Sequence, residues 1–223
     1  RCGLFTNAER WLQWLVDAEV GFETESYLQA KFPLIDGVIV SAQLIPNEEF
    51  AMAVKHLPIN AGLYQNDILL AQHGTPLEKI SYRGQAPLRL TERWDLFQQN
   101  ETILRADFEL YTAGKKSAKL SSTNTLIGPA DQLFIEEGAQ IEGATLNTKQ
   151  GPIYIGKNAE IMEGALLRGP LAVLEGAVVK MGAKIYGATT IGPECRIGGE
   201  VSNSIFYGYS NKGHDGFIGN ALI

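Results

Sequence analysis

The residue in this sequence best suited to proton-transfer chemistry is His214, one of only three histidines in the chain. It lies in the polar segment Tyr209–Asn220, which is rich in glycine and asparagine. Imidazole titrates near neutral pH, so it can accept and return a proton at working pH, which is the task of a general base. A plain exposed turn histidine remains the alternative interpretation of His214.

The other groups of chemical interest have structural explanations. His56 ends a predicted helix, where a cation interacts favourably with the helix dipole, and His73 precedes a glycine turn and should be exposed. A zinc site built from histidines would need about three of them, whereas the second half of the chain has only His214. Cys195 falls at a position of small residues, which favours packing over nucleophilic chemistry. The sequence therefore predicts no metal site in its second half.

An aliphatic residue recurs at every sixth position through that second half. These residues, which we call anchors, are Ile155, Ile161, Leu167, Val173, Val179, Ile185, Ile191 and Ile197, with Ile135 and Ile141 at the same spacing upstream. The period predicts a solenoid in which each six-residue unit forms one strand and one turn, and about three units close a coil. One coil cannot bury its apolar face alone, so stacked coils stabilise one another.

Two irregularities interrupt this period. The anchors Ile141 and Ile155 are fourteen residues apart, which indicates a two-residue insertion within Asn147–Pro152. The period also breaks after Ile197, and such a break predicts an extruded loop that carries His214, because loops commonly carry sites. The basic residues of the repeat should lie on its exterior: Arg168, Lys180, Lys184 and Arg196.

Residues 1–90 carry the mixed pattern of an α/β domain. The predicted elements are a helix with its N-cap at Asn7, a buried strand over Gly37–Ile45, a helix from Asn47 to about His56, and strands over Ala61–Tyr64 and Ile68–Ala71 around a turn at Asn66–Asp67.

A long helix should join the two halves, from Thr91 to about Tyr111. Its predicted buried stripe is Trp94, Phe97, Ile103, Leu104 and Phe108. We therefore divide the chain into a partial α/β domain over residues 1–90, a connecting helix and linker over residues 91–120, and an all-β solenoid over residues 121–223. Both ends fall inside patterned segments, so we expect further residues before Arg1 and after Ile223.

This order of elements resembles that of the sugar-1-phosphate nucleotidyltransferases. These include the bifunctional N-acetylglucosamine-1-phosphate uridyltransferase/glucosamine-1-phosphate acetyltransferases and the glucose-1-phosphate thymidylyltransferase-like proteins. The segments that carry the resemblance are Arg1–Thr6, Trp94–Asn100 and Tyr209–Asn220. The repeat itself resembles the left-handed parallel β-helix of the hexapeptide acyltransferases, which implies a homotrimer.

The resemblance implies a catalytic role for one residue, His214, and four residues near it are candidate substrate contacts. In the acetyltransferase relatives a histidine in a matching segment is the general base, so His214 would take the proton of an amino-sugar phosphate that attacks the thioester of acetyl-CoA. Asn211 and Lys212 could contact a phosphate, and Asn220 lies near a polar position of the pattern. Phe217 stands where relatives often have tyrosine, so a phenol contact to the sugar is lost.

The nucleotidyltransferase half departs from the family pattern. The family's glycine-rich loop binds nucleotide phosphates through backbone N–H groups, and by the resemblance it would precede Arg1. The family also has a strand ending in Gly-Asp that binds Mg²⁺. Here the strand Val38–Val40 leads to Ala42 and Gln43, and a neutral amide is a poorer magnesium ligand than a carboxylate. Gln43 therefore argues against magnesium-dependent nucleotidyl transfer.

Composition narrows the partners further. The net charge of −6 argues against a nucleic-acid-binding surface. The sequence has no run of about 18 apolar residues, so we expect no membrane span. The two cysteines are far apart in the sequence and no signal peptide is visible, which fits a cytoplasmic protein. We predict an enzyme of sugar-nucleotide biosynthesis that binds a sugar phosphate and a nucleotide or acetyl-CoA. The alternative is a non-catalytic sugar-nucleotide-binding or regulatory protein, with the β-helix as a trimerisation scaffold.

Overall fold

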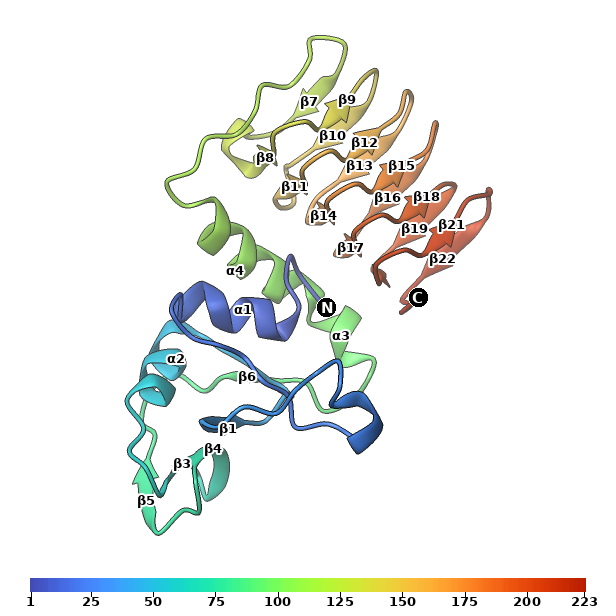
Figure 1. The fold of residues 1–223 in the computed structure, drawn as a ribbon. Coiled ribbons are helices and arrows are strands. Elements are labelled where there is room, and N and C mark those ends of the chain that lie inside the picture. The colour runs from blue at the N-terminus through green and yellow to red at the C-terminus, as the bar shows by residue number, and fades with distance from the viewer. The chain divides into compact units, whose positions relative to one another are not determined.

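The computed structural model describes all residues from 1 to 223. The chain forms two compact units, one of residues 6–91 and one of residues 92–223 together with residues 1–5. The first unit mixes helices with small sheets, and the second stacks short parallel strands coil upon coil (Figure 1). None of the helices has both the length and the apolar character needed to cross a membrane.

The α/β class predicted for the first part of the chain is confirmed in residues 6–91. Its helices are α1 (Asn7–Trp14), the 3₁₀ helix η1 (Ser26–Leu28) and α2 (Glu48–Lys55). Its main sheet has the order β1 (Val38–Val40), β4 (Ile68–His73), β3 (Ala61–Gln65) and β5 (Glu78–Ser81), and a small antiparallel pair joins β2 (Leu44–Ile45) to β6 (Leu88–Arg89). The core centres on Phe50 of α2, which is fully buried in one cluster with the strand residues Leu44 and Leu63.

The hairpin and the second helix follow the sequence prediction. Strands β3 and β4 pair antiparallel around Asn66 and Asp67, which have φ of 48° and 64°. Two successive positive φ values are what a tight hairpin turn needs to match the twist of its strands. Helix α2 begins at the predicted cap, because the Asn47 side chain accepts the Phe50 N–H at 2.9 Å.

The predicted cap of the first helix is wrong by one residue. Thr6 is the N-cap, since its hydroxyl accepts the Glu9 N–H at 3.2 Å and the Glu9 carboxylate accepts the Thr6 N–H at 2.7 Å. This reciprocal pair is a capping box. The Asn7 side chain instead donates to the carbonyls of Ala42 and Leu44.

The apolar run Gly37–Ile45 is two strands rather than one. Strand β1 ends at Val40, the chain turns through Ser41, whose carbonyl accepts the Leu44 N–H at 3.0 Å, and β2 then pairs in a different sheet. Ile39 is 41% exposed, so β1 is not the buried strand that its composition predicted.

The long connecting helix is also divided. Helix α3 (Asp95–Gln98) and helix α4 (Asn100–Thr112) adjoin at Gln99. Trp94 precedes α3 and is 52% exposed, contrary to its predicted burial, and Phe97 is half-buried. The rest of the predicted stripe is buried on α4: Ile103, Leu104 and Phe108.

The second half of the chain is a parallel β-helix, as predicted, with three sheets along its length (Figure 1). The groove sheet contains β7 (Thr125–Ile127), β10 (Thr145–Asn147), β13 (Leu166–Arg168), β16 (Lys184–Tyr186), β19 (Glu200–Ser202) and β22 (Phe217–Gly219). The covered sheet contains β8 (Leu133–Ile135), β11 (Ile153–Ile155), β14 (Leu171–Val173), β17 (Thr189–Ile191) and β20 (Ile205–Phe206). The third sheet contains β9 (Gln140–Ile141), β12 (Glu160–Ile161), β15 (Val178–Val179), β18 (Arg196–Ile197) and β21 (Asn211–Lys212), and a 3₁₀ turn, η2 (Ala130–Gln132), precedes β8. Every predicted anchor from Ile135 to Ile197 lies in one buried core.

Strand pairing explains the irregular spacing of the anchors. Ile141 is followed after five residues by the anchor Leu146, and Leu146 after nine by Ile155, where six is the usual step. The predicted two-residue insertion is thus the net result of a corner shortened by one residue and a corner lengthened by three.

The register break after Ile197 is a shortened corner, and the predicted extruded loop is absent. The next anchor, Val201, follows after four residues, so only Gly198 and Gly199 connect β18 to β19. The coils then continue in register, because Lys212 pairs with Ile197 in the third sheet.

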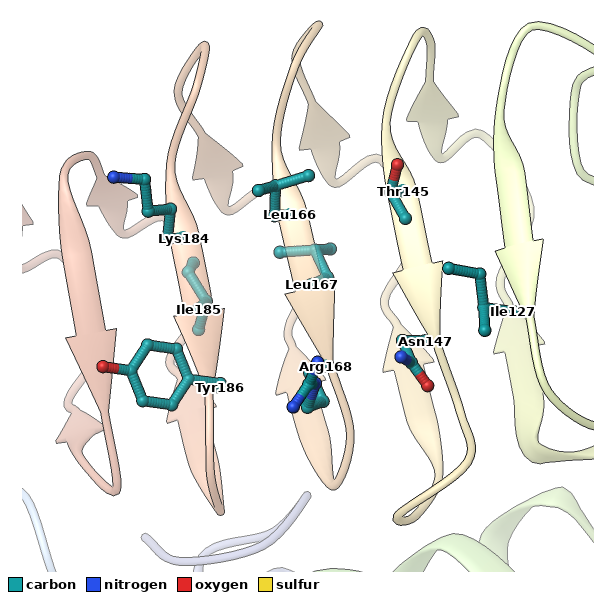
Figure 2. Close-up of a pocket in the computed structure, with 9 residues that line it drawn as sticks. All are labelled: Ile127, Thr145, Asn147, Leu166, Leu167, Arg168, Lys184, Ile185 and Tyr186. Atoms are coloured by element: carbon teal, nitrogen blue, oxygen red, sulfur yellow. The ribbon is translucent and has the colours of Figure 1, made fainter.

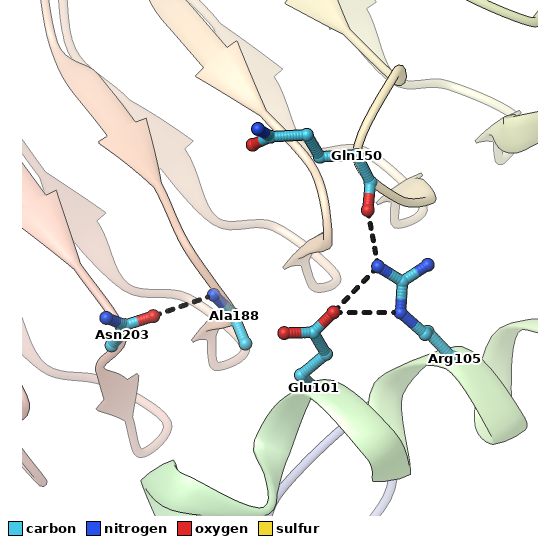
Figure 3. A network of polar contacts seen from close by, with 5 residues as sticks. All are labelled: Glu101, Arg105, Gln150, Ala188 and Asn203. Atoms are coloured by element: carbon cyan, nitrogen blue, oxygen red, sulfur yellow. Dashed lines mark hydrogen bonds and ion pairs between the residues drawn. The ribbon is translucent and has the colours of Figure 1, made fainter.

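Helix α4 lies along the covered sheet (Figure 1). Leu104 and Phe108 of the helix pack on outward-facing side chains of the sheet, including Phe134 and Tyr154. On the exposed side of the helix, Arg105 bonds to the Glu101 carboxylate and to the main-chain carbonyl of Gln150 (Figure 3).

Residues 1–5 form a tight turn that is fixed to α4 through buried polar groups. The Asn100 side chain accepts the Gly3 N–H at 2.7 Å and donates to the Ala188 carbonyl at 2.8 Å. Asp107 accepts the Leu4 N–H at 2.9 Å. Gly3 has φ of 62°, and a Cβ there would lie 2.3 Å from Asp107, so this turn requires glycine.

Candidate functional site

His214 lies on a β-helix corner of ordinary length. The corner spans Gly213–Gly216 and connects β21 of the third sheet to β22 of the groove sheet. It has four residues, as do two earlier corners that connect the same sheets, 162–165 and 180–183. The His214 side chain is exposed and has no hydrogen-bond partner within the chain. It is therefore accessible to a substrate, and only its main chain is held.

Two lysine side chains hold that main chain. The Lys212 ammonium donates to the carbonyls of Gly198 at 2.7 Å, His214 at 2.9 Å and Gly216 at 2.9 Å. The Lys180 ammonium donates to the Gly213 carbonyl at 3.0 Å. Lys180 was predicted to lie on the exterior, but it is half-buried because the shortened corner lets its side chain pass beside Gly198.

Three other predicted substrate contacts surround this corner. Asn211 is exposed on the third sheet, and Phe217 is 63% exposed on the groove sheet. Asn220 is exposed and has φ of 51°, close to the 45° of Asn203 at the corresponding corner of the preceding coil. Asparagine tolerates this left-handed backbone, so the corner geometry is one reason for an asparagine at position 220, and its exposed side chain remains accessible. Asn203 uses its side chain to accept the Ala188 N–H at 3.1 Å (Figure 3).

The groove sheet, whose last strand follows the His214 corner, carries a shallow depression on its outer face. Its volume is about 410 Å³, and it lies over β7, β10, β13 and β16 (Figure 2). Figure 2 shows Leu166 and Thr145 in one row of outward side chains, and Tyr186, Arg168 and Asn147 in the next. The depression is lined by Ile127, Thr145, Asn147, Leu166, Leu167, Arg168, Lys184, Ile185 and Tyr186. An apolar floor with two cations at its sides suits an anionic ligand that has an apolar part.

A phenol and a carboxylate continue this face toward His214. The Tyr186 hydroxyl donates to Glu200 at 2.5 Å, and this hydrogen bond raises the pKa of Tyr186. Tyr186 lines the depression, and Glu200, which pairs with Phe217 across β19 and β22, lies between the depression and the His214 corner. Sequence reasoning missed Tyr186 and Glu200. Their positions, one residue from the anchors Ile185 and Val201, were the available signal, because neighbours of an anchor point outward.

The other two histidines have structural roles. His56 is the C-cap of α2, as predicted, and its ring is 2.8 Å from the Met52 carbonyl. His73 is half-buried, against the predicted exposure, with its ring 3.1 Å from the Leu57 carbonyl. No group of three His, Cys, Asp or Glu side chains in residues 1–223 could hold a metal ion.

Cys195 occupies a packing position. It is fully buried in the ladder of small residues, with Ala177 in the preceding coil and Ser210 in the next. Burial raises the pKa of its thiol, which donates to the Tyr207 carbonyl at 2.9 Å. A thiol with a raised pKa is a poor nucleophile. Arg168, Lys184 and Arg196 are exposed, as predicted.

The groups around Gln43 are a poor chemical fit for a magnesium ion. Gln43 is exposed at the end of the turn after β1, and its contacts are main-chain ones, to the Ser41 hydroxyl at 3.4 Å and from the Leu90 N–H at 2.9 Å. The neighbouring Ala42 carbonyl is taken by Asn7. Neutral oxygens of this kind, without a carboxylate, do not fit a cation that is usually bound through one or two carboxylates.

Comparison with known protein families finds a match over residues 1–116 to a family described as sugar nucleotidyl transferase. The match covers the whole α/β unit and continues through α3 and α4, which fold with the β-helix. No curated protein matches the chain.

Proposed function

The chain belongs to the sugar nucleotidyl transferase family, and we propose that it acts in sugar-nucleotide biosynthesis by transferring an acetyl group from acetyl-CoA to an amino-sugar phosphate. The observation that carries this proposal is the His214 corner, where an accessible imidazole lies at the edge of a hollowed β-helix face. The joining of an α/β unit to a β-helix supports this proposal, because it is the order of elements that resembles the bifunctional uridyltransferase/acetyltransferases and the thymidylyltransferase-like proteins.

In this reaction His214 is the general base. The amine nitrogen of the sugar attacks the thioester carbon, a C–N bond forms, and the C–S bond breaks. The imidazole takes the proton that the nitrogen loses, and the CoA thiolate leaves and is protonated to the thiol. Base catalysis of this kind contributes about 10²- to 10⁴-fold to a rate.

The surfaces next to the His214 corner supply binding groups for both substrates. Asn211 and Asn220 offer amides to the sugar phosphate, and the Phe217 ring offers an apolar face to the sugar. Arg168 and Lys184 flank the depression and suit the phosphates of acetyl-CoA, with the pantetheine chain over Leu166.

We extend the proposal to a cytoplasmic homotrimer assembled through the β-helix. The covered sheet is occupied by α4, whereas the groove sheet exposes Leu166 and Phe217 and is free to meet another copy. A buried thiol such as Cys195 persists in a reducing compartment.

The test uses the full-length protein with acetyl-CoA and glucosamine-1-phosphate, and follows thiol release. His214→Ala should lower turnover by about 100-fold or more, while the matched variant His56→Ala, at an exposed helix end, should leave it unchanged. Light scattering checks that both variants keep the mass of the wild type. Unchanged turnover in His214→Ala would overturn the assignment of the base.

A parallel assay follows pyrophosphate from UTP or dTTP with sugar-1-phosphates. Pyrophosphate without thiol release would make the β-helix a scaffold and the first unit the catalytic one, despite Gln43. If neither assay detects product and the protein binds a sugar nucleotide tightly, the result would support the non-catalytic alternative.

A further inference from the structure

Lys212 occupies a position where the fold elsewhere places an aliphatic anchor. Along the third sheet it continues the ladder of Ile141, Ile161, Val179 and Ile197, each of which is buried in the apolar core. A lysine in such a ladder costs stability unless its ammonium finds hydrogen-bond acceptors. The structure supplies three.

The shortened corner beneath Lys212 leaves these three carbonyl groups accessible to its ammonium. Regular corners bond to one another through their main chains, as in the Gly182 N–H to the Glu163 carbonyl at 3.1 Å. The corner of Gly198 and Gly199 lacks two residues, so it cannot match the four-residue corner Gly213–Gly216 above it.

The Lys212 ammonium fills this gap. It donates downward to Gly198 and upward to His214 and Gly216, which uses all three of its N–H groups. A Cβ on Gly199, which has φ of 70°, would lie 2.7 Å from that ammonium, so glycine there leaves the space for it. No carboxylate pairs with Lys212 or with Lys180, which bonds to Gly213 from the other side.

We propose that Lys212 is a positioning residue: its ammonium replaces the two missing corner residues and fixes the turn that presents His214 at the edge of the groove sheet. This inference rests on the proposed function for its catalytic consequence. It gives Lys212 a different role from a phosphate contact, because no N–H of the ammonium is left for a substrate.

The first test measures the corner itself. Amide hydrogen exchange is followed in the full-length protein at Glu200, whose N–H bonds to the Gly216 carbonyl at 3.0 Å. Lys212→Met, which keeps the length of the side chain without its donors, should speed exchange there by about 10- to 100-fold, because hydrogen bonds to charged groups are the stronger ones. Lys157→Met, at an exposed corner lysine, is the matched control and should have no effect.

Two further arms keep the result interpretable. Lys212→Arg retains the charge but its planar fork cannot meet three carbonyls as an ammonium does, so its exchange should fall between wild type and Lys212→Met. In Lys212→Ala, added propylammonium should restore slow exchange at Glu200. If Lys212→Met does not fold, these two arms decide. Exchange unchanged in every Lys212 variant would overturn the proposal.

Kinetics then distinguish positioning from substrate binding. In Lys212→Met the kcat for thiol release should fall at least about tenfold, with KM for the amino-sugar phosphate within about twofold and the shape of the pH profile unchanged. A tenfold higher KM with unchanged kcat and unchanged exchange would make Lys212 a phosphate ligand and overturn the proposal. Failure of the proposed function appears separately, as wild-type protein without thiol release, and the exchange arm still decides whether Lys212 holds the turn.

Discussion

Replacing Asn100 with alanine should undock residues 1–5 from the β-helix unit. Asn100 is fully buried, and its amide joins the Gly3 N–H to the Ala188 carbonyl. The Thr190 hydroxyl lies 3.2 Å from the same amide nitrogen. Alanine removes both the donor and the acceptor, and it leaves two main-chain groups without partners in a space that excludes water.

The expected cost follows from those two groups. A buried donor or acceptor without a partner costs about 1–3 kcal/mol, so the loss of partners by two groups should lower the free energy of the local opening by roughly 2–6 kcal/mol. Because about 1.4 kcal/mol is a factor of ten in an equilibrium constant, protection of the Leu4 amide should fall by roughly 30- to 20,000-fold. That amide is a suitable probe, since it bonds to Asp107 at 2.9 Å and opens when the segment leaves α4.

The assay is native-state hydrogen exchange read by NMR. Glu109→Ala, on the exposed side of the same helix, is the control for helix propensity and should leave the Leu4 amide protected. Asn100→Asp keeps an acceptor for Gly3 but loses the donor to Ala188 and buries a charge, so it should be at least as harmful near neutral pH. If Asn100→Ala and Glu109→Ala gave equal protection at Leu4, the docking role of the Asn100 amide would be refuted.

Two further predictions concern buried titratable groups. Burial raises the pKa of Tyr154, and its hydroxyl donates to Glu136 at 3.2 Å. The folded chain therefore holds this proton more tightly than the unfolded chain. The stability that this provides is complete below about pH 10, the pKa of tyrosine in an unfolded chain, and is lost as the pH rises beyond it. Urea midpoints measured at rising alkaline pH should fall less steeply in Tyr154→Phe than in wild type, and parallel slopes would contradict this account. Cys195 should resist iodoacetamide in the folded protein and react on unfolding, as followed by mass spectrometry, and rapid labelling without urea would show that its coil opens.

The repeat could be predicted because every coil uses the same physics. An inward aliphatic residue recurs wherever a strand crosses the prism, so the anchors from Ile155 to Ile197 are visible in the sequence alone. The lengths of the corners cannot be predicted in this way, because a corner can gain or lose residues without changing the six-residue period on either side of it. The shortened corner after Ile197 therefore gave a false prediction of a loop, although the sequence carried a sign of it in the paired Gly198 and Gly199.

In the first unit the errors arise where local signals compete. Thr6 and Glu9 have the spacing of a capping box, and Asn7 beside them is an equally good cap by residue type. The structure assigns Thr6 because Asn7 is needed by the carbonyls of Ala42 and Leu44, far along the chain. The hydrogen-bond partners of Asn100 could not be predicted for the same reason, because Gly3 and Ala188 are distant from it in the sequence.

The extent of the family match has a physical counterpart in the packing of α4. The matched stretch, residues 1–116, runs beyond the α/β unit and ends just after that helix. Leu104 and Phe108 of α4 are buried against Phe134 and Tyr154, which lie outside the match. Burying such side chains is worth about 1.5–3 kcal/mol each, and that stabilisation exists only when the β-helix is present. In this chain the last helix of the matched region therefore depends for its burial on strands that lie beyond the match, so removing the β-helix should leave α4 without its packing partner.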